Sequence, residues 1–195
     1  MNKKMLVAGL LTMSAMSVSM MASDLQYFLG AGASKVYSNY NASVSVPSIN
    51  YISDTSGELD DIGLMVKTGI IANKTHRFSV IYNGYSEDNT DTKTLVGAYD
   101  YLIPLGKSFR LYGGIHTGAI QLEVDDQSKD LGLAYGAQIG SIIDITKNIE
   151  FEFGASYSKY TVDREFNGTI GSVPYIATAE IEDATQMFAS LNYKF

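Results

Sequence analysis

The residue types in this 195-residue chain that could do chemistry are two histidines and a set of charged side chains. His116 shares its face with Gly114 and Gly118, so that face offers no nucleophile for acyl transfer by a histidine–serine pair. His76 falls at a turn, where we expect it to be solvated, and neither histidine has a second ligand at metal-binding spacing. The chain has no cysteine, which excludes disulfides and thiolate metal sites. We therefore predict no catalytic residues, no metal site, no cofactor and no enzyme activity.

The charged candidates alternate with other residues in a way that places them on the small, polar face of their segments. If residues 104–106 form a three-residue hairpin loop, Asp100 lies opposite Arg110. The same parity places Asp144 opposite Glu150, a repulsive pair unless Arg110 lies between them. Because unpaired buried charges are costly, we predict a structural ion-pair network, with an ion path or gate as the alternative. The predicted network consists of Lys67, Asp100, Arg110, Asp144, Glu150 and Glu152.

The elements that must position these residues are strands. Alternation of apolar and polar residues with a period of two covers nearly all of the chain after residue 24, and this alternation is typical of strands with one apolar face. The composition, with 18 glycines, 14 tyrosines and 3 prolines, also favours strands over helices. The eight predicted runs are residues 25–37, 61–73, 77–87, 92–103, 108–124, 129–145, 149–161 and about 179–195.

The connectors between these runs are of two alternating kinds. Three are short, at residues 73–75, 104–106 and 146–148, and fit three-residue hairpin loops. The others are longer or acidic, at residues 38–60, 88–91, 125–130 and 165–178. An even number of strands with tight turns at one end is typical of a bacterial outer-membrane barrel. We predict an all-β, eight-stranded antiparallel up-and-down transmembrane barrel, with the tight turns and both termini in the periplasm.

The composition of the two faces decides between a membrane barrel and a soluble one. One face carries bulky Leu, Ile, Phe and Tyr, and the other carries Gly, Ser, Ala and Gln with a few charges. A soluble barrel would have Lys- and Glu-rich outer faces instead. Aromatic residues near the strand ends also fit two interfacial girdles. The predicted girdles are Tyr27, Tyr101, Phe109, Phe151, Tyr193 and Phe195 at the turn end, and Tyr37, Tyr82, Tyr85, Tyr157 and Tyr160 at the loop end.

The amino-terminal segment has the pattern of an export signal. Residues 1–4 are basic, residues 5–18 are apolar, and small residues follow at 19–23, so we predict a signal peptide at 1–22 and a barrel domain at 23–195. No later stretch approaches the roughly 20 apolar residues that a spanning helix needs. The formal net charge is −7 and becomes more negative without the lysines of the signal, which argues against a nucleic-acid partner.

The carboxy-terminal residues carry a resemblance to a known family. Leu191, Tyr193 and Phe195 alternate and end the chain on an aromatic residue. With the export signal and the eight alternating runs, this end resembles the small outer-membrane barrels of the OmpA/OmpX and opacity-protein type, although Ser190 and Phe188 depart from the family's pattern. The resemblance implies that periplasmic chaperones and the barrel-assembly machinery recognise Leu191, Tyr193 and Phe195. We expect no peptidoglycan-binding domain.

The expected function follows from the size of the barrel. Eight strands enclose an interior that side chains just fill, so we expect no wide pore. We predict a monomer in contact with lipid and lipopolysaccharide, with a structural, envelope-integrity role or an adhesin-like role toward an unknown host or surface ligand. The alternatives are a narrow porin-like channel and a lipid-modifying enzyme; such enzymes have a serine two residues after the histidine, where this chain has Gly118. The acidic connectors are a solvated rim or, alternatively, bind divalent cations that bridge to lipopolysaccharide.

Overall fold

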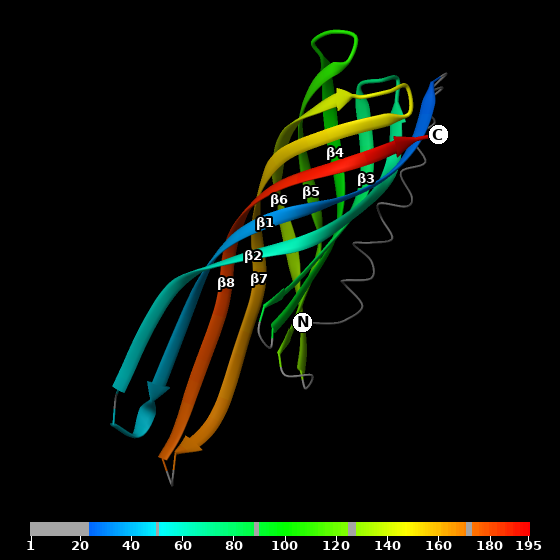
Figure 1. The fold of residues 1–195 in the computed structure, drawn as a ribbon. Coiled ribbons are helices and arrows are strands. Elements are labelled where there is room, and N and C mark those ends of the chain that lie inside the picture. Colours follow the sequence, from blue (N-terminus) through cyan, green and yellow to red (C-terminus); the bar gives the residue numbers. More distant parts are fainter. Residues whose placement is uncertain (1–23, 50, 88–89, 125–127, 171–172) are drawn as a thin grey trace.

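The computed structural model describes residues 24–195 except 50, 88–89, 125–127 and 171–172. Its strands form one closed antiparallel barrel in which neighbours in sequence pair and β8 pairs with β1, which confirms the predicted fold (Figure 1). The predicted signal peptide lies outside the described residues, and no described helix is long and apolar enough to cross a membrane. The elements are β1 (Leu25–Val46), η1 (Pro47–Ile49), β2 (Tyr51–Ala72), β3 (His76–Glu87), β4 (Thr90–Pro104), β5 (Phe109–Val124), β6 (Ser128–Asp144), β7 (Ile149–Ile170) and β8 (Val173–Lys194).

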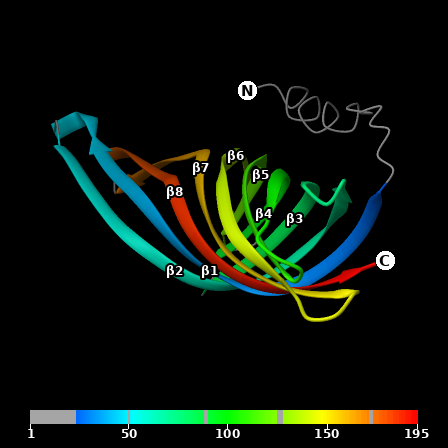
Figure 2. The ribbon, with the colours of Figure 1, turned by 90° about the horizontal axis from the view of Figure 1, so that it is seen from above.

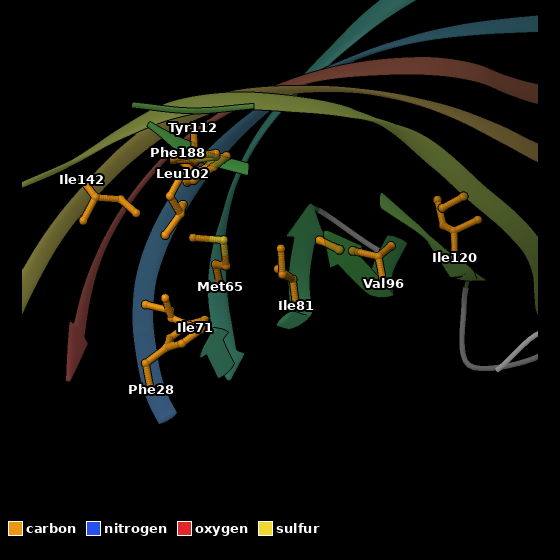
Figure 3. Packing of buried hydrophobic residues seen from close by; sticks show 12 residues of the cluster. Phe28, Met65, Ile71, Ile81, Val96, Leu102, Tyr112, Ile120, Ile142 and Phe188 are labelled. Carbon is orange, nitrogen blue, oxygen red and sulfur yellow. The ribbon is translucent and has the colours of Figure 1, made fainter. Parts of the chain in front are cut away.

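The barrel wall has an apolar outer face and a mixed inner face. Leu64, Ile115 and Ile139 point outward and are 65–74% exposed. Residues of opposite parity, such as Met65 and Leu102, are buried inside the barrel and gather in one cluster (Figure 3). This arrangement inverts the usual pattern of a soluble protein, in which most large apolar side chains turn away from the surface.

Two of the three predicted tight turns are confirmed and the third is displaced. Ala72 pairs with His76 around residues 73–75, where Asn73 and Lys74 have positive φ angles of 52° and 62°. The turn at residues 146–148 is closed by a backbone hydrogen bond of 2.9 Å from Ile145 to Ile149.

The predicted loop at residues 104–106 is wrong, because Pro104 still belongs to β4 and pairs with Arg110. Proline is tolerated at a strand end, where a missing N–H costs little, and the turn is made by the Gly-Lys-Ser segment at residues 106–108. The displacement is an even number of residues, so the same residues of β4 and β5 face inward and outward as predicted. The partner of Asp100 does change: it is Gly114 and not Arg110.

Four strands are much longer than predicted. β1, β2, β7 and β8 have 22 residues each, so the loops predicted at 38–60 and 165–178 are wrong and are largely strand. The connectors predicted at 88–91 and 125–130 shrink to residues 88–89 and 125–127, which lie outside the described residues. The prediction failed because these segments are polar and lack the apolar face on which strand recognition relied.

Beyond the barrel the four long strands continue as a sheet of their own, no longer paired with β3 or β6. The β2–β3 ladder ends at Leu64 and Gly84, and the β6–β7 ladder ends at Ala134 and Tyr160. Past these points the strands run on in the order β2-β1-β8-β7 and curve away from β3–β6 (Figures 1 and 2). We call this part, residues 38–46, 51–63, 161–170 and 173–183, the projecting sheet.

A β-bulge in β8 lies at the base of the projecting sheet. Asp183 pairs with Asn39, and Ile181 pairs with the next residue of β1, so Glu182 is the extra residue. Such a bulge bends the strand and turns consecutive side chains toward one face. Here the two carboxylates accept hydrogen bonds from neighbouring amides of β1, Asp183 from Asn39 at 2.8 Å and Glu182 from Asn41 at 2.9 Å.

Candidate functional site: the filled lumen and the outer wall

A group of four charged side chains crosses the middle of the lumen, and we call it the central quartet. It consists of Lys67, Arg77, Asp100 and Glu152, all almost completely buried. Lys67 Nζ lies 2.5 Å from Glu152 Oε2, and the Arg77 guanidinium donates to Glu152 at 2.8 and 3.1 Å and to Asp100 at 2.9 Å. Two cations therefore balance two carboxylates.

Two amides complete the central quartet. Gln138 donates to Asp100 Oδ1 at 2.7 Å, and Asn192 donates to Glu152 Oε2 at 2.9 Å. Gln138 satisfies the one Asp100 oxygen that Arg77 does not contact, and Asn192 adds a donor to Glu152 Oε2; a buried ion-pair network is stable only when such oxygens are satisfied.

A second group lies closer to the tight turns, and we call it the turn-end quartet. Arg110 Nη2 lies 3.0 Å from Asp144 Oδ1 and also contacts Glu150. Lys194 Nζ lies 2.7 Å from Asp144 and 2.7 Å from Glu150. This quartet is neutral as well, so neither group leaves a net charge in the lumen.

An aromatic ring packs against the central quartet. The Arg77 guanidinium carbon lies 4.4 Å from the centroid of the Tyr112 ring, a cation–π contact inside the barrel. The ring fits because Gly140 and Gly154 stand under it: a Cβ atom on either would lie 2.5 Å from the Tyr112 hydroxyl oxygen. The inward glycines therefore make room for side chains that fill the lumen, and do not widen a channel.

All six residues of the predicted charge network lie in the two quartets. Asp144 does pair with Glu150, and Arg110 contacts both. The prediction missed Arg77 and Lys194, although alternation had already placed both on the inward face of their strands. It also gave Asp100 the wrong partner, because Arg77 holds it instead.

A histidine–serine contact that was not expected joins β5 to β7 across Gly136 of β6. His116 is 6% exposed and faces inward, and its Nε2 lies 2.9 Å from Ser158 Oγ. Its Nδ1 has no hydrogen-bond partner among the described residues, so no carboxylate orients the ring as in a catalytic triad. The adjoining cavity has a volume of about 30 Å³, room for about two water molecules and not for a lipid or peptide substrate. The pair is therefore a buried side-chain contact beside a water-sized cavity.

His76 lies on the outer wall, and its predicted solvation is wrong. Its Nδ1 is 2.9 Å from the Tyr99 hydroxyl, and its ring also contacts Tyr101 edge-on. It is partly buried because these aromatic rings cover it. In the described part of the chain, no three His, Cys, Asp or Glu side chains group closely enough to hold a metal ion.

Aromatic side chains also lie inside the lumen at the end away from the tight turns, which we call the hairpin end. The Tyr85 hydroxyl lies 3.2 Å from Ser34 Oγ and accepts a hydrogen bond of 2.7 Å from Gln186. Tyr160 packs against the same cluster. Both tyrosines point inward by strand parity, so their assignment to an outer girdle was wrong.

The carboxy-terminal residues lie on the outer wall. Leu191, Tyr193 and Phe195 are 50–70% exposed, and the Tyr193 and Phe195 rings meet edge-on at 5.2 Å. The Phe195 N–H donates to the Tyr27 carbonyl at 3.0 Å, which joins the chain end to β1. The aromatic end is therefore part of the seam that closes the barrel.

Comparisons with known proteins give no family for this chain. No family model matches it, and no curated protein matches it. Solved structures do match.

Neisserial surface protein A is 16% identical, with 87% of this chain and 97% of that chain covered and a TM-score of 0.60. OprG from Pseudomonas aeruginosa is 14% identical, with 87% and 95% covered and a TM-score of 0.64. Outer membrane protein H from P. aeruginosa, solved in DHPC micelles, is 21% identical, with 86% and 99% covered and a TM-score of 0.52. The chain has the fold of the small outer-membrane β-barrels. At these identities the likeness extends to the fold alone, because one fold carries many functions.

Proposed function

We propose that the protein is a closed barrel of the bacterial outer membrane that holds the projecting sheet outside the cell, in a structural or surface-interaction role. The observation that carries this proposal is the contrast between a filled lumen and an extended exterior. Two neutral quartets and aromatic side chains occupy the interior, while a 22-residue strand is about twice the 9–11 residues that cross a bilayer. The surplus length leaves the membrane as the projecting sheet.

The two ends of the barrel differ in charge and in the length of their connections. Each tight turn carries one exposed lysine, Lys74, Lys107 or Lys147. The projecting sheet carries exposed acids, among them Asp54 and Asp60. We place the turn end, with both ends of the mature chain, in the periplasm, because short periplasmic turns and long external hairpins are the rule in such barrels.

Two measurements test this proposal. In planar bilayers, the purified protein should give no steady single-channel conductance. The matched control is the Lys67→Ala/Glu152→Ala double variant, which keeps the lumen neutral but removes the side chains that join β2 to β7, and it should conduct. Steady conductance by the unchanged protein would contradict a closed barrel.

The absence of native cysteines allows a clean test of orientation. On intact cells, a membrane-impermeant maleimide should label Asp54→Cys, in the projecting sheet, and leave Lys107→Cys, in a tight turn, unlabelled. Labelling of Lys107→Cys alone would reverse the proposed orientation, and recovery of a dissolved periplasmic protein would refute the membrane location.

The second candidate is a narrow channel, and a small cavity with several polar lining groups favours it. Asn83, Thr94, His116 and Gln186 line about 30 Å³ between the central quartet and the contacts around Tyr85. Water molecules in this cavity would belong to a path through the lumen only if the central quartet and the contacts around Tyr85 both opened. The same bilayer recording decides between this candidate and the closed scaffold.

We also propose that Leu191, Tyr193 and Phe195 serve as the assembly signal, read by periplasmic chaperones and the barrel-assembly machinery. Their support is exposure on the outer wall beside the closing seam. Deleting Phe195 should lower the amount of folded barrel in the outer membrane, measured by fractionation and the heat-dependent shift in electrophoretic mobility. Replacing Phe195 with Tyr keeps an aromatic end and should restore the amount. Normal membrane levels after deletion would remove this role.

A further inference from the structure

The outer wall is hollowed at the seam where the barrel closes. An open, apolar groove of about 410 Å³ runs over β2, β1, β8 and β7 near the turn end. Its volume is in the range of small-molecule sites, about 300–1,000 Å³. It is lined by Leu29, Ala31, Val66, Ile149, Leu191 and Tyr193, with the Gly30 and Asn192 positions between them.

The hollow arises from one short side chain between longer ones. Ala31 pairs with Val66 on one side and with Leu191 on the other, so a methyl group stands between two branched side chains. In the next row toward the turns, Leu29 pairs with Tyr193, which in turn pairs with Ile149. The longer side chains of Leu29, Tyr193 and Ile149 therefore form one edge of the hollow at Ala31.

The surroundings of the groove indicate what occupies it. The turn at residues 146–148 directly precedes Ile149, and it carries the exposed Lys147. An apolar groove that ends beside an exposed lysine matches an amphiphile with a hydrocarbon chain and an anionic head group, since surface lysines attract anionic lipid.

We infer that this groove is a binding site for one anionic phospholipid, with an acyl chain over Ala31 and the phosphate toward Lys147. The inference rests on the proposed function, because a turn end in the periplasm faces the leaflet in which phospholipid lies. The hairpin end, with its acidic side chains, has the opposite charge and does not attract an anionic head group.

Native mass spectrometry of the full barrel, titrated with phosphatidylglycerol in detergent, tests the inference. We expect one lipid bound more tightly than the rest. Ala31→Phe fills the groove and should weaken this site about tenfold, as expected when roughly two methylene groups are kept out. Ala137→Phe, at another exposed outward alanine on β6, is the matched control and should leave binding unchanged.

A second pair of variants tests the head group. Lys147→Glu should weaken phosphatidylglycerol binding but not binding of a zwitterionic lipid, whereas Lys107→Glu, in a different turn, should change neither. Equal binding by Ala31→Phe and the unchanged protein, preferential binding of lipid A, or a protein dimer that excludes lipid would each overturn the inference. If the barrel fractionates with the outer membrane yet retains no lipid, the inference fails alone; if it does not reach that membrane, the proposed function fails with it.

Discussion

The two ion-pair quartets have the same charges but join the barrel in different ways. The central quartet links β2, β3 and β4 to β7 across the lumen, through side chains no more than 3% exposed. The turn-end quartet links the consecutive strands β5 to β8 along one wall, and its Arg110 and Asp144 side chains are 11% and 22% exposed. The first is a buried cross-brace, and the second is a wall contact with two partly exposed members.

This difference predicts in which quartet the loss of one charge lowers the free energy of unfolding more. A buried ion without its partner retains its full desolvation penalty, whereas water can replace a partner near a surface. Removal of one buried acid from each quartet therefore compares the cost of the cations that are left behind, which are 2–3% exposed at the centre and 8–11% exposed at the turn end.

The largest effect is expected at the centre. Glu152→Gln removes the carboxylate that holds both Lys67 and Arg77 and leaves one excess positive charge in the lumen. We expect the free energy of unfolding to fall by about 3–5 kcal/mol. Urea unfolding in lipid vesicles, followed by electrophoretic mobility, measures it. Glu152→Gln combined with Lys67→Met restores neutrality and should recover most of the loss; no recovery would show that hydrogen-bond geometry, and not charge, dominates.

A smaller effect is expected at the turn end. Glu150 is itself buried, but Glu150→Gln leaves Arg110 and Lys194, 11% and 8% exposed, with Asp144, 22% exposed, as their remaining acid. We expect a loss of about 1–2 kcal/mol in the same unfolding measurement. A loss as large as that of Glu152→Gln would mean that access to water does not distinguish the two groups.

The inward charges were predictable because strand parity is fixed by backbone geometry. Parity also placed Arg77 beside Ser79 and Lys194 beside Asn192 on the inward face, so the signal for these two residues was present in the sequence. The partner of Asp100 was not predictable in the same way. It depends on where the β4–β5 turn falls, and Pro104 did not end the strand where its residue type indicated.

The projecting sheet is the part that local pattern did not reveal. Strands within the lipid band need one bulky apolar face, and this requirement gave a strong alternation. Beyond the lipid band no such requirement holds. Polar residues such as Asp54 and Ser56 therefore lie in β2 although their sequence pattern is typical of a loop. The ladder between β1 and β2 continues there because backbone hydrogen bonds need no particular side chain.

The smallest effect is expected at an ion pair outside the lumen, which completes the comparison. Lys35 Nζ lies 2.6 Å from Asp60 Oδ2, with side chains 41% and 61% exposed. Exposed pairs are screened by water and salt, so Lys35→Ala should lower the free energy of unfolding by less than about 1 kcal/mol. The difference should vanish in high salt, whereas that of Glu152→Gln should persist because salt does not reach the central quartet. A Lys35→Ala loss comparable to that of Glu150→Gln would show that closeness of charges, and not exclusion of water, sets the strength of the ion pairs.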